Sequence, residues 1–138
     1  MKKTPLKKIK SISKLKKEVW DVFSKLIRAT YRDWKGEARC VTCDKFYPVK
    51  LLQAGHFIPG RMNSILFDER GVHPQCYNCN INLKGNPRKY DAFMERTYGS
   101  EVIAELDRLS GQPRPFTHTE LETMKAGYKK RLAILGWN

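Results

Sequence analysis

Two cysteine pairs, each with two residues between its cysteines, constrain this chain more than any other feature. The pairs are Cys40-Val-Thr-Cys43 and Cys76-Tyr-Asn-Cys79. Two C-x2-C turns bring four thiolates together, and four thiolates complete a tetrahedral zinc site. Such a site leaves no position for water or substrate, so we expect the zinc to be structural. Disulfides are the alternative, and a reducing compartment disfavours them.

The segment between the two pairs is unusually long. Simple zinc ribbons leave roughly 15–20 residues there, whereas this chain inserts 32, Asp44 to Gln75. That length suffices for a hairpin and for a loop with a function of its own. The segment contains His56 and His73, and Asn80 follows the last cysteine directly.

The charge balance predicts a polyanionic partner. Lys and Arg number 27 against 14 for Asp and Glu, which gives a net charge of +13. The first seventeen residues, MKKTPLKKIKSISKLKK, hold eight lysines and no acid. A solvated basic surface is the alternative, but this clustering favours nucleic acid.

We expect neither a membrane span nor a secretory signal. No apolar run approaches the roughly 18 residues of a spanning helix. Leu6 and Ile9 stand alone among lysines, so the N-terminus has no apolar signal core. We therefore expect the protein in the cytoplasm of a bacterial host cell, associated with the nucleoid.

The chain divides into a basic arm and one domain. Residues 1–12 are expected to form a flexible arm, and 13–138 a single domain of class α+β. Apolar residues recur every three or four positions over 13–35, which predicts a helix. Residues 39–85 form the four-cysteine core, and 87–136 a helical tail.

The core is predicted to be a ββα unit. KFYPVKLL is one strand candidate, short or at an edge because of Pro48, and AGHFI is a second. PGRMNS has loop composition, and NCNINLKG predicts a short helix that Gly85 ends. In the tail, Thr117 is expected as an N-cap with Glu120 as its capping-box partner.

A zinc deaminase does not fit the histidine and the cysteines. Those enzymes carry H-x-E followed by P-C-x-x-C. Here Ile58 stands two residues after His56, and Gln75 rather than proline precedes Cys76.

The motifs AGH and CYNCN resemble those of the HNH (ββα-metal, endonuclease VII-like) endonucleases. In zinc-bearing members a hairpin ends in the catalytic histidine, and the second cysteine pair opens the helix. The resemblance implies that His56 is the general base that activates water. It also implies that Asn80 binds a catalytic Mg²⁺ or Mn²⁺ ion.

A more extensive resemblance is to the NinG (Rap) recombination proteins of lambdoid phages. CVTCDKFYPVKLLQAGHF and then LFDERGVHPQCYNCNINLKGN carry it, with AGHF, FDER and HPQCYNCN in one order. This resemblance implies a nuclease for branched DNA, such as Holliday junctions and displacement loops. The partners it suggests are branched DNA, a second copy of the chain, and phage or host recombination proteins.

Two glycines depart from the HNH pattern. Gly55 stands where many HNH sites have a metal ligand, so the ion is expected to use Asn80, substrate phosphate and another group. Gly71 lies near the position of the asparagine that orients the base. It cannot orient a ring, which leaves Asp68, Glu69 or His73 as substitutes.

Each candidate residue has a simpler alternative. His56 and His73 are predicted as catalytic, but either is also explained as a structural histidine with satisfied hydrogen bonds. Asn80 is alternatively a helix cap. The candidate DNA-binding residues are Arg61, Arg70 and Lys84, and any of them is alternatively a solvated surface charge.

Two functions follow from these patterns. The first is a metal-dependent, structure-selective endonuclease that cuts branched DNA. The second is a non-catalytic zinc module that binds DNA or assists recombination proteins, and Gly55 and Gly71 favour it.

Overall fold

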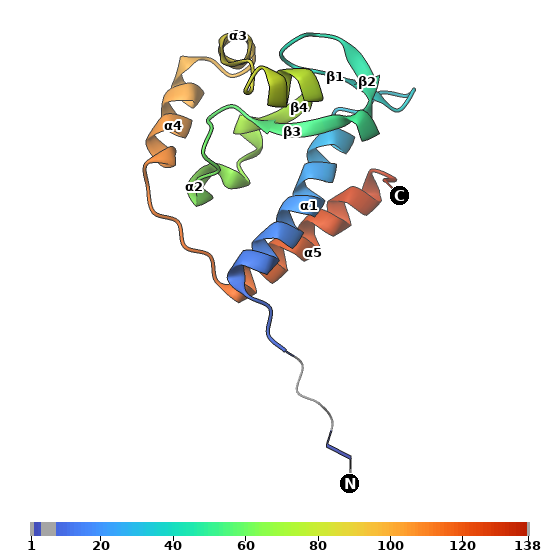
Figure 1. The fold of residues 1–138 in the computed structure, drawn as a ribbon, viewed down its shortest axis with the longest axis vertical. Helices are drawn as coiled ribbons and strands as arrows, with labels where there is room; N and C mark the ends of the chain where they lie inside the picture. Colours follow the sequence, from blue (N-terminus) through green and yellow to red (C-terminus); the bar gives the residue numbers. More distant parts are fainter. Residues whose placement is uncertain (1, 4–7, 138) are drawn as a thin grey trace.

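The computed structural model describes residues 2–3 and 8–137 and shows two β-hairpins above a pair of long helices (Figure 1). The hairpins and the short helices lie at one end, and α1 and α5 run side by side below them. This is a mixed α+β arrangement, as the sequence predicted. Its helices and strands are α1 (Ile12–Thr30), β1 (Glu37–Arg39), β2 (Phe46–Pro48), β3 (Leu52–His56), α2 (Asn63–Leu66), β4 (Val72–Cys76), α3 (Pro87–Thr97), α4 (Ser100–Ser110) and α5 (His118–Ile134).

Helix α1 is shorter than predicted at its C-terminal end. The Ser11 side chain caps it by accepting from the backbone N–H of Lys14. The helix ends at Thr30 rather than at residue 35. The next residues turn instead, because the Asp33 carboxylate accepts the backbone N–H groups of Lys35 and Glu37. Trp34 is 89% exposed in this turn.

Helix α5 packs against α1 along their length. The Thr117 hydroxyl accepts from the backbone N–H of Glu120, as predicted for the N-cap. The second half of the capping box does not form, since the Glu120 carboxylate pairs with Arg114 at 2.7 Å. Leu121 is buried with Leu15 and Val19 of α1. Burial of these apolar side chains joins the two ends of the chain.

The predicted basic arm is held at its C-terminal end. Residues 1 and 4–7 of this arm lie outside the described part of the chain. Lys10 pairs with Glu18 at 2.7 Å, and Glu18 also pairs with Lys125 of α5 at 3.0 Å. The backbone carbonyl of Lys10 accepts from His118. The arm therefore joins the α1–α5 pair before helix α1 begins.

The two predicted strands exist but do not pair with each other. β2 pairs with β1, and β3 pairs with β4, both antiparallel. Strand β4 was missing from the prediction, because VHPQC contains a proline and no apolar alternation. In the β3–β4 register, Gly55 lies opposite His73, and His56 lies opposite Val72. The single hairpin expected from KFYPVKLL and AGHFI is therefore wrong.

The β3–β4 hairpin presents its two faces to different helices. Ala54 and Val72 pack on Phe23 and Ile27 of α1. Successive side chains of a strand point to opposite faces, so the neighbouring Gly55 faces the turn after β4. That turn is η3 (Asn78–Asn82), a short π-helical segment in the place of the predicted helix. No helix within the described residues is long and apolar enough to cross a membrane.

Candidate active site and zinc centre

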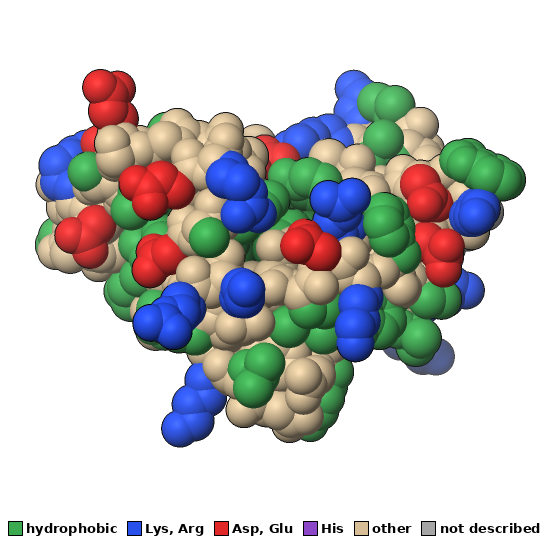
Figure 2. Space-filling view, turned by 90° about the horizontal axis from the view of Figure 1, so that it is seen from above, with side chains coloured by type: hydrophobic (Ala, Val, Ile, Leu, Met, Phe, Trp, Pro, Cys, Tyr) green, Lys and Arg blue, Asp and Glu red, His purple; other side chains and the backbone are tan. Residues whose placement is uncertain are grey.

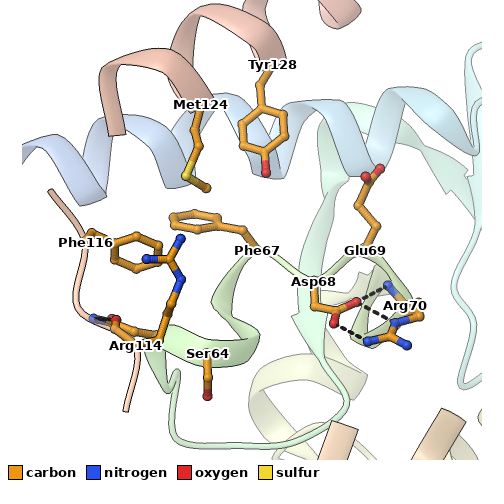
Figure 3. Close-up of a pocket in the computed structure, with 10 residues that line it drawn as sticks. Ser64, Phe67, Asp68, Glu69, Arg70, Arg114, Phe116, Met124 and Tyr128 are labelled. Atoms are coloured by element: carbon orange, nitrogen blue, oxygen red, sulfur yellow. Dashed lines mark hydrogen bonds and ion pairs between the residues drawn. The ribbon is translucent and has the colours of Figure 1, made fainter. Parts of the chain in front are cut away.

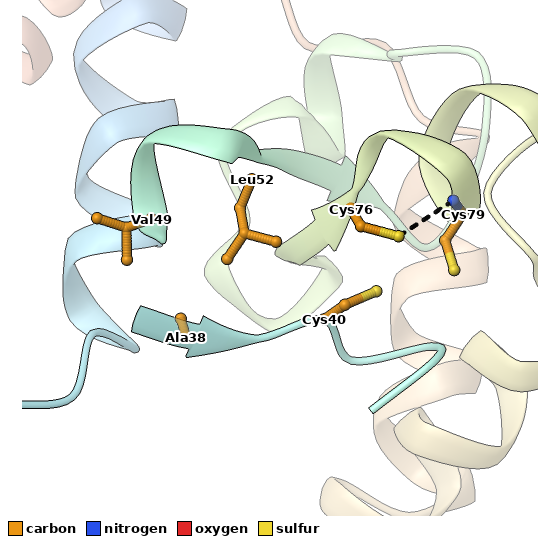
Figure 4. Packing of buried hydrophobic residues seen from close by; sticks show 6 residues of the cluster. All are labelled: Ala38, Cys40, Val49, Leu52, Cys76 and Cys79. Atoms are coloured by element: carbon orange, nitrogen blue, oxygen red, sulfur yellow. Dashed lines mark hydrogen bonds between the residues drawn. The ribbon is translucent and has the colours of Figure 1, made fainter. Parts of the chain in front are cut away.

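The four cysteines cluster at one end of the β-hairpins, and Figure 4 shows three of them, Cys40, Cys76 and Cys79. Their sulfur atoms all lie within 4.8 Å of one another, and Sγ of Cys43 and Cys76 are 3.9 Å apart. Tetrahedral zinc with Zn–S bonds of about 2.3 Å separates its sulfurs by about 3.8 Å. Ala38, Val49 and Leu52 pack against the cluster, and Cys40, Cys76 and Cys79 are buried. The four cysteines thus cluster as the predicted zinc site requires.

The thiols of this cluster need a cation to ionise together. Burial raises the pKa of Cys43 to about 12 and also raises that of Cys79, whereas hydrogen bonds from Thr42 and backbone groups outweigh burial and lower the pKa of Cys40 to about 6. Four thiolates this close would repel one another in a dry environment. A divalent ion removes that repulsion and deprotonates its thiol ligands. Because four sulfurs fill a tetrahedral shell, the site would hold structure and perform no reaction.

His56 ends strand β3 and is held between a carbonyl and an indole. Its Nε2 lies 3.1 Å from the backbone carbonyl oxygen of Leu66. Its ring stacks on Trp20 of α1, with centroids 4.9 Å apart and planes at 19°. The Arg61 guanidinium carbon lies 4.5 Å from the centroid of the same indole. The Trp20 indole and the Leu66 carbonyl, from separate parts of the chain, therefore fix the imidazole, and Arg61 covers the indole.

This environment determines which ring nitrogen of His56 is basic. A carbonyl oxygen only accepts, so Nε2 carries the proton and Nδ1 keeps its lone pair. Burial lowers the pKa of His56, and the positive charge of Arg61 lowers it further. The lowered pKa favours the neutral ring, and in this tautomer the Nδ1 lone pair can accept a proton.

Asn80 lies in a surface groove between η3, β3 and α1. Its Nδ2 donates to Oε1 of Gln53 on β3 at 2.7 Å. The groove has a volume of about 380 Å³. Trp20, Arg28 and Arg61 also line it, and the Arg28 guanidinium donates to the backbone carbonyls of Ser24 and Leu52. Among the described residues, no Asp or Glu lines this groove.

Gly55 contacts Asn80 more closely than its sequence position suggested. A Cβ built on Gly55 would lie 3.0 Å from Oδ1 of Asn80 and would overlap Oε1 of Gln75. The space of a side chain at position 55 is thus taken by two amide oxygens. Asn80 of η3 therefore lies against Gly55, the residue that precedes His56 in the sequence.

His73 is buried completely and has both ring nitrogens engaged. Tyr90 donates its hydroxyl to the Gly55 carbonyl at 2.7 Å and accepts from His73 Nδ1 at 2.9 Å. Nε2 of His73 then accepts from the Tyr98 hydroxyl at 2.8 Å. Burial lowers the pKa of His73 to about 4. This geometry favours the structural alternative for His73, since a buried, saturated ring cannot reach DNA.

The expected substitutes for an orienting asparagine are engaged elsewhere. Asp68 accepts two hydrogen bonds from the Arg70 guanidinium, at 3.0 and 2.7 Å. Glu69 pairs with Arg131 of α5 at 2.7 Å. Asp68 and Glu69 line another pocket, of about 530 Å³, with Phe67, Met124 and Tyr128 (Figure 3). The group that accepts a hydrogen bond from His56 is therefore the Leu66 carbonyl, and not Asp68, Glu69 or His73.

The three predicted DNA-binding residues differ in their surroundings. Arg61 is exposed and lines the Asn80 groove. Arg70 lines the pocket of Figure 3 and is paired with Asp68. Lys84 is exposed after η3, with a positive φ of 52°. Figure 2 shows that basic and acidic side chains are interspersed over the upper face, with hydrophobic side chains exposed between them.

Several groove residues escaped prediction from the sequence. Trp20 lies within the predicted N-terminal helix, and no motif there indicates that it stacks on His56. Arg28 and Gln53 carried no motif, and both line the groove. For Gln75, the one sequence signal was its position directly before Cys76 in the motif HPQC. Each of these residues reaches the site through tertiary packing that the local sequence does not encode.

Comparison with known proteins identifies the family. The family described as Bacteriophage Lambda NinG protein matches residues 1–136. Protein ninG of Escherichia phage 933W is 27% identical over 110 residues, 79% of this chain and 54% of that protein. Protein ninG of Escherichia phage lambda is 26% identical over 110 residues, 79% of this chain and 53% of the relative.

A shorter match is to Protein ninG of Enterobacteria phage H19B, at 31% identity over 83 residues, 59% of this chain and 41% of that protein. The chain thus spans about half the length of the curated relatives it matches. No solved structure matches it. Because the family match extends over almost the whole sequence, the chain belongs to the family of the bacteriophage lambda NinG protein.

Proposed function

We propose that this protein is a metal-dependent, structure-selective endonuclease that hydrolyses phosphodiesters in branched recombination intermediates such as Holliday junctions and displacement loops. The observation that carries the proposal is the fixed tautomer of His56, whose Nε2 is bound to the Leu66 carbonyl. A neutral imidazole with Nδ1 free is the form that a general base requires. The hairpin β3–β4 followed by η3 supports an HNH-like core, since Asn80 of η3 donates to Gln53 on β3, the strand that His56 ends.

In the proposed reaction, His56 Nδ1 takes a proton from water as the oxygen attacks phosphorus. The opposite P–O bond breaks, and the leaving oxygen takes up a proton from solvent. A bound Mg²⁺ or Mn²⁺ ion would polarise the phosphate and stabilise the leaving oxygen. Asn80 Oδ1 is the ligand we assign to it, because an amide oxygen suits a hard cation.

Basic residues beside the groove support a DNA substrate. Arg28 and Arg61 line it with Asn80, and guanidinium groups bind phosphate in a forked geometry. The net charge of +13 adds attraction at longer range. A second copy of the chain and phage or host recombination proteins remain the other partners we propose.

Cleavage of a synthetic four-way junction tests the proposal. We expect cleavage with Mg²⁺ or Mn²⁺ and a loss of about 10²-fold or more in His56→Ala, as for removal of a general base. His118→Ala is the matched control, because His118 is exposed on α5. Equal trace cleavage by the wild type and His56→Ala, with equal DNA binding, would show that the protein is not this nuclease.

The second candidate function is a non-catalytic zinc module that binds DNA. The observation that favours it is the absence of any carboxylate lining the Asn80 groove. Such a module would bind junctions in a salt-dependent manner. It would leave the DNA intact at every divalent-ion concentration, which separates it from the nuclease.

A further inference from the structure

We propose that Tyr77 and Ile81, on the turn that follows strand β4, insert into the opened base stack at the branch point of the DNA. The inference rests on the proposed function, because it names the side chains by which that function would select a branched substrate over a continuous duplex. Tyr77 and Ile81 would contact bases, and basic residues of the same segment would contact phosphates.

The segment around η3 exposes large apolar side chains to water. Tyr77 is 56% exposed, Ile81 48% and Leu83 47%. Single exposed apolar residues are common on protein surfaces, but a group of them within a few residues indicates a contact surface. None of the three belongs to a hydrophobic cluster of the described residues. The core therefore gains little from these side chains, and a binding role accounts for them better.

Tyr77 and Ile81 lie on one face of the turn. Side chains four residues apart are neighbours on a helix. The hydrogen bond of 3.1 Å from Asn82 Nδ2 to Asn78 Oδ1 shows the same spacing within this turn. Ile81 also lines the groove that contains Asn80. An aromatic ring and a branched aliphatic side chain therefore stand together at the edge of the candidate active site.

The turn is held firmly on its inner side. Cys79 belongs to the cysteine cluster, and its backbone N–H donates to Cys76 Sγ at 3.4 Å (Figure 4). The Gly85 N–H donates to the Cys79 carbonyl at 2.9 Å, and the Gly85 carbonyl accepts from the buried Gln75 amide at 2.9 Å. A preorganised support of this kind lowers the entropy cost of binding, which favours insertion of its exposed side chains.

The charge around these side chains fits DNA. Residues 77–90 contain Lys84, Arg88 and Lys89 and no Asp or Glu. None of these three cations forms an ion pair within the described residues. A second copy of the chain docked symmetrically on this face would bring the same cations together, and such like-charge contacts are unfavourable. A polyanion complements the face instead.

A branch point is the part of DNA where insertion costs least. An apolar side chain that enters a continuous duplex must first unstack a base step. Bases that are unpaired or poorly stacked need less energy to move, and an aromatic ring binds such a base by stacking on it. Tyr77 and Ile81 would therefore favour a branched DNA and would hold the branch beside the Asn80 groove.

Affinities for two DNAs test this selectivity. A labelled four-way junction and a linear duplex of the same arm sequence are titrated without added divalent ions, with fluorescence anisotropy as the readout. Tyr77→Ala/Ile81→Ala should weaken junction binding about tenfold or more and change duplex binding less than about twofold. Ile134→Ala is the matched control, because Ile134 is 78% exposed on α5 and should leave both affinities unchanged. Unchanged junction affinity in a zinc-loaded double variant would overturn the inference.

Lys84→Ala separates phosphate contacts from base contacts. Loss of a lysine that neutralises one phosphate should weaken junction and duplex binding alike and lower the salt dependence by about one charge. If the double variant Tyr77→Ala/Ile81→Ala also lost equal affinity for both DNAs, its two side chains would not recognise the branch, and the inference would fail.

A 2-aminopurine base at the branch point reports insertion directly, since its fluorescence rises when it leaves the base stack. Saturating wild-type protein should raise this signal, whereas the double variant should not. An unchanged signal with the wild type, or an equal rise with both proteins, would overturn the inference. So would a changed oligomeric state of the double variant in sedimentation with unchanged junction binding, which would assign this face to contacts between copies. Failure of the nuclease proposal would instead appear as junction DNA left intact with Mg²⁺ while Tyr77 and Ile81 still set the preference for junctions.

Discussion

The imidazole of His56 lies nearly parallel to the indole of Trp20, with ring centroids 4.9 Å apart. Helix α1 thereby contributes a wall of the candidate site. The indole shields one face of the imidazole from water, and the Leu66 carbonyl fixes its edge. Helix α1 also packs against α5, so both ends of the chain help to position a residue in its middle.

Replacing Trp20 by leucine should raise the pKa of His56 toward its usual value of 6.5. Burial is the main cause of the lowered pKa, and loss of the indole would let water reach the ring. The free energy of unfolding should fall by about 2 kcal/mol, since a large aromatic contact is lost. An NMR titration of the imidazole signals measures the pKa. Trp34→Leu is the control, because Trp34 is 89% exposed and should leave both quantities unchanged.

Removing one zinc ligand should unfold the core around the hairpins. Cys76→Ser is expected to lose the metal and to lower the melting temperature by about 10 °C or more, since metal binding contributes directly to folding. Zinc content by mass spectrometry and thermal unfolding by circular dichroism are the measurements. Tyr77→Ser is the matched control, because this neighbouring side chain is 56% exposed. Full zinc content with normal melting in Cys76→Ser would contradict a structural role.

Alanine substitutions at Gly55 and Gly71 should lower the free energy of unfolding by different amounts. In Gly55→Ala the new methyl would overlap Gln75 and force its amide from Thr42 and Gly85, which should cost about 1–3 kcal/mol. In Gly71→Ala the methyl would meet Leu106 at 3.4 Å, an ordinary contact. That variant should lie within about 0.5 kcal/mol of the wild type. Chemical denaturation compares the two, and equal stabilities would contradict the overlap at Gly55.

Acid should destabilise the protein through His73. Its folded pKa is about 4, against 6.5 for an unperturbed histidine. Between about pH 6.5 and 4, the unfolded chain is therefore protonated at His73 whereas the folded chain is not. The free energy of unfolding falls as the pH drops through this window. The full loss would be ~3 kcal/mol.

The matched variants for this pH effect are His73→Gln and His118→Gln. The difference in unfolding free energy between the wild type and His73→Gln should shrink across that pH window. His118→Gln should follow the wild type, since His118 is exposed. An NMR pKa of His73 near 6.5 would show that the ring is not held neutral by burial.

Local sequence patterns predicted most elements of the fold. The apolar periodicity of α1 and the Thr117 cap of α5 are encoded by neighbouring residues, so they appear close to where they were expected. The end of α1 was placed too late because the Asp33 turn depends on a single side chain accepting two backbone N–H groups. Strand pairing was also misassigned, because register follows from packing between distant segments.

The sequence alone predicted that the four cysteines cluster, because the spacing of the two pairs encodes it, and the resemblance of short motifs to a known family singled out His56 and Asn80 as candidates. Only the tertiary structure decided what surrounds these residues. It replaced the expected substitutes for an orienting asparagine with the Leu66 carbonyl, buried His73 among tyrosines, and placed the Gln75 oxygen beside Gly55. The physical reason is that a motif fixes residue types along a chain, whereas hydrogen-bond partners and burial arise from segments that meet only after folding.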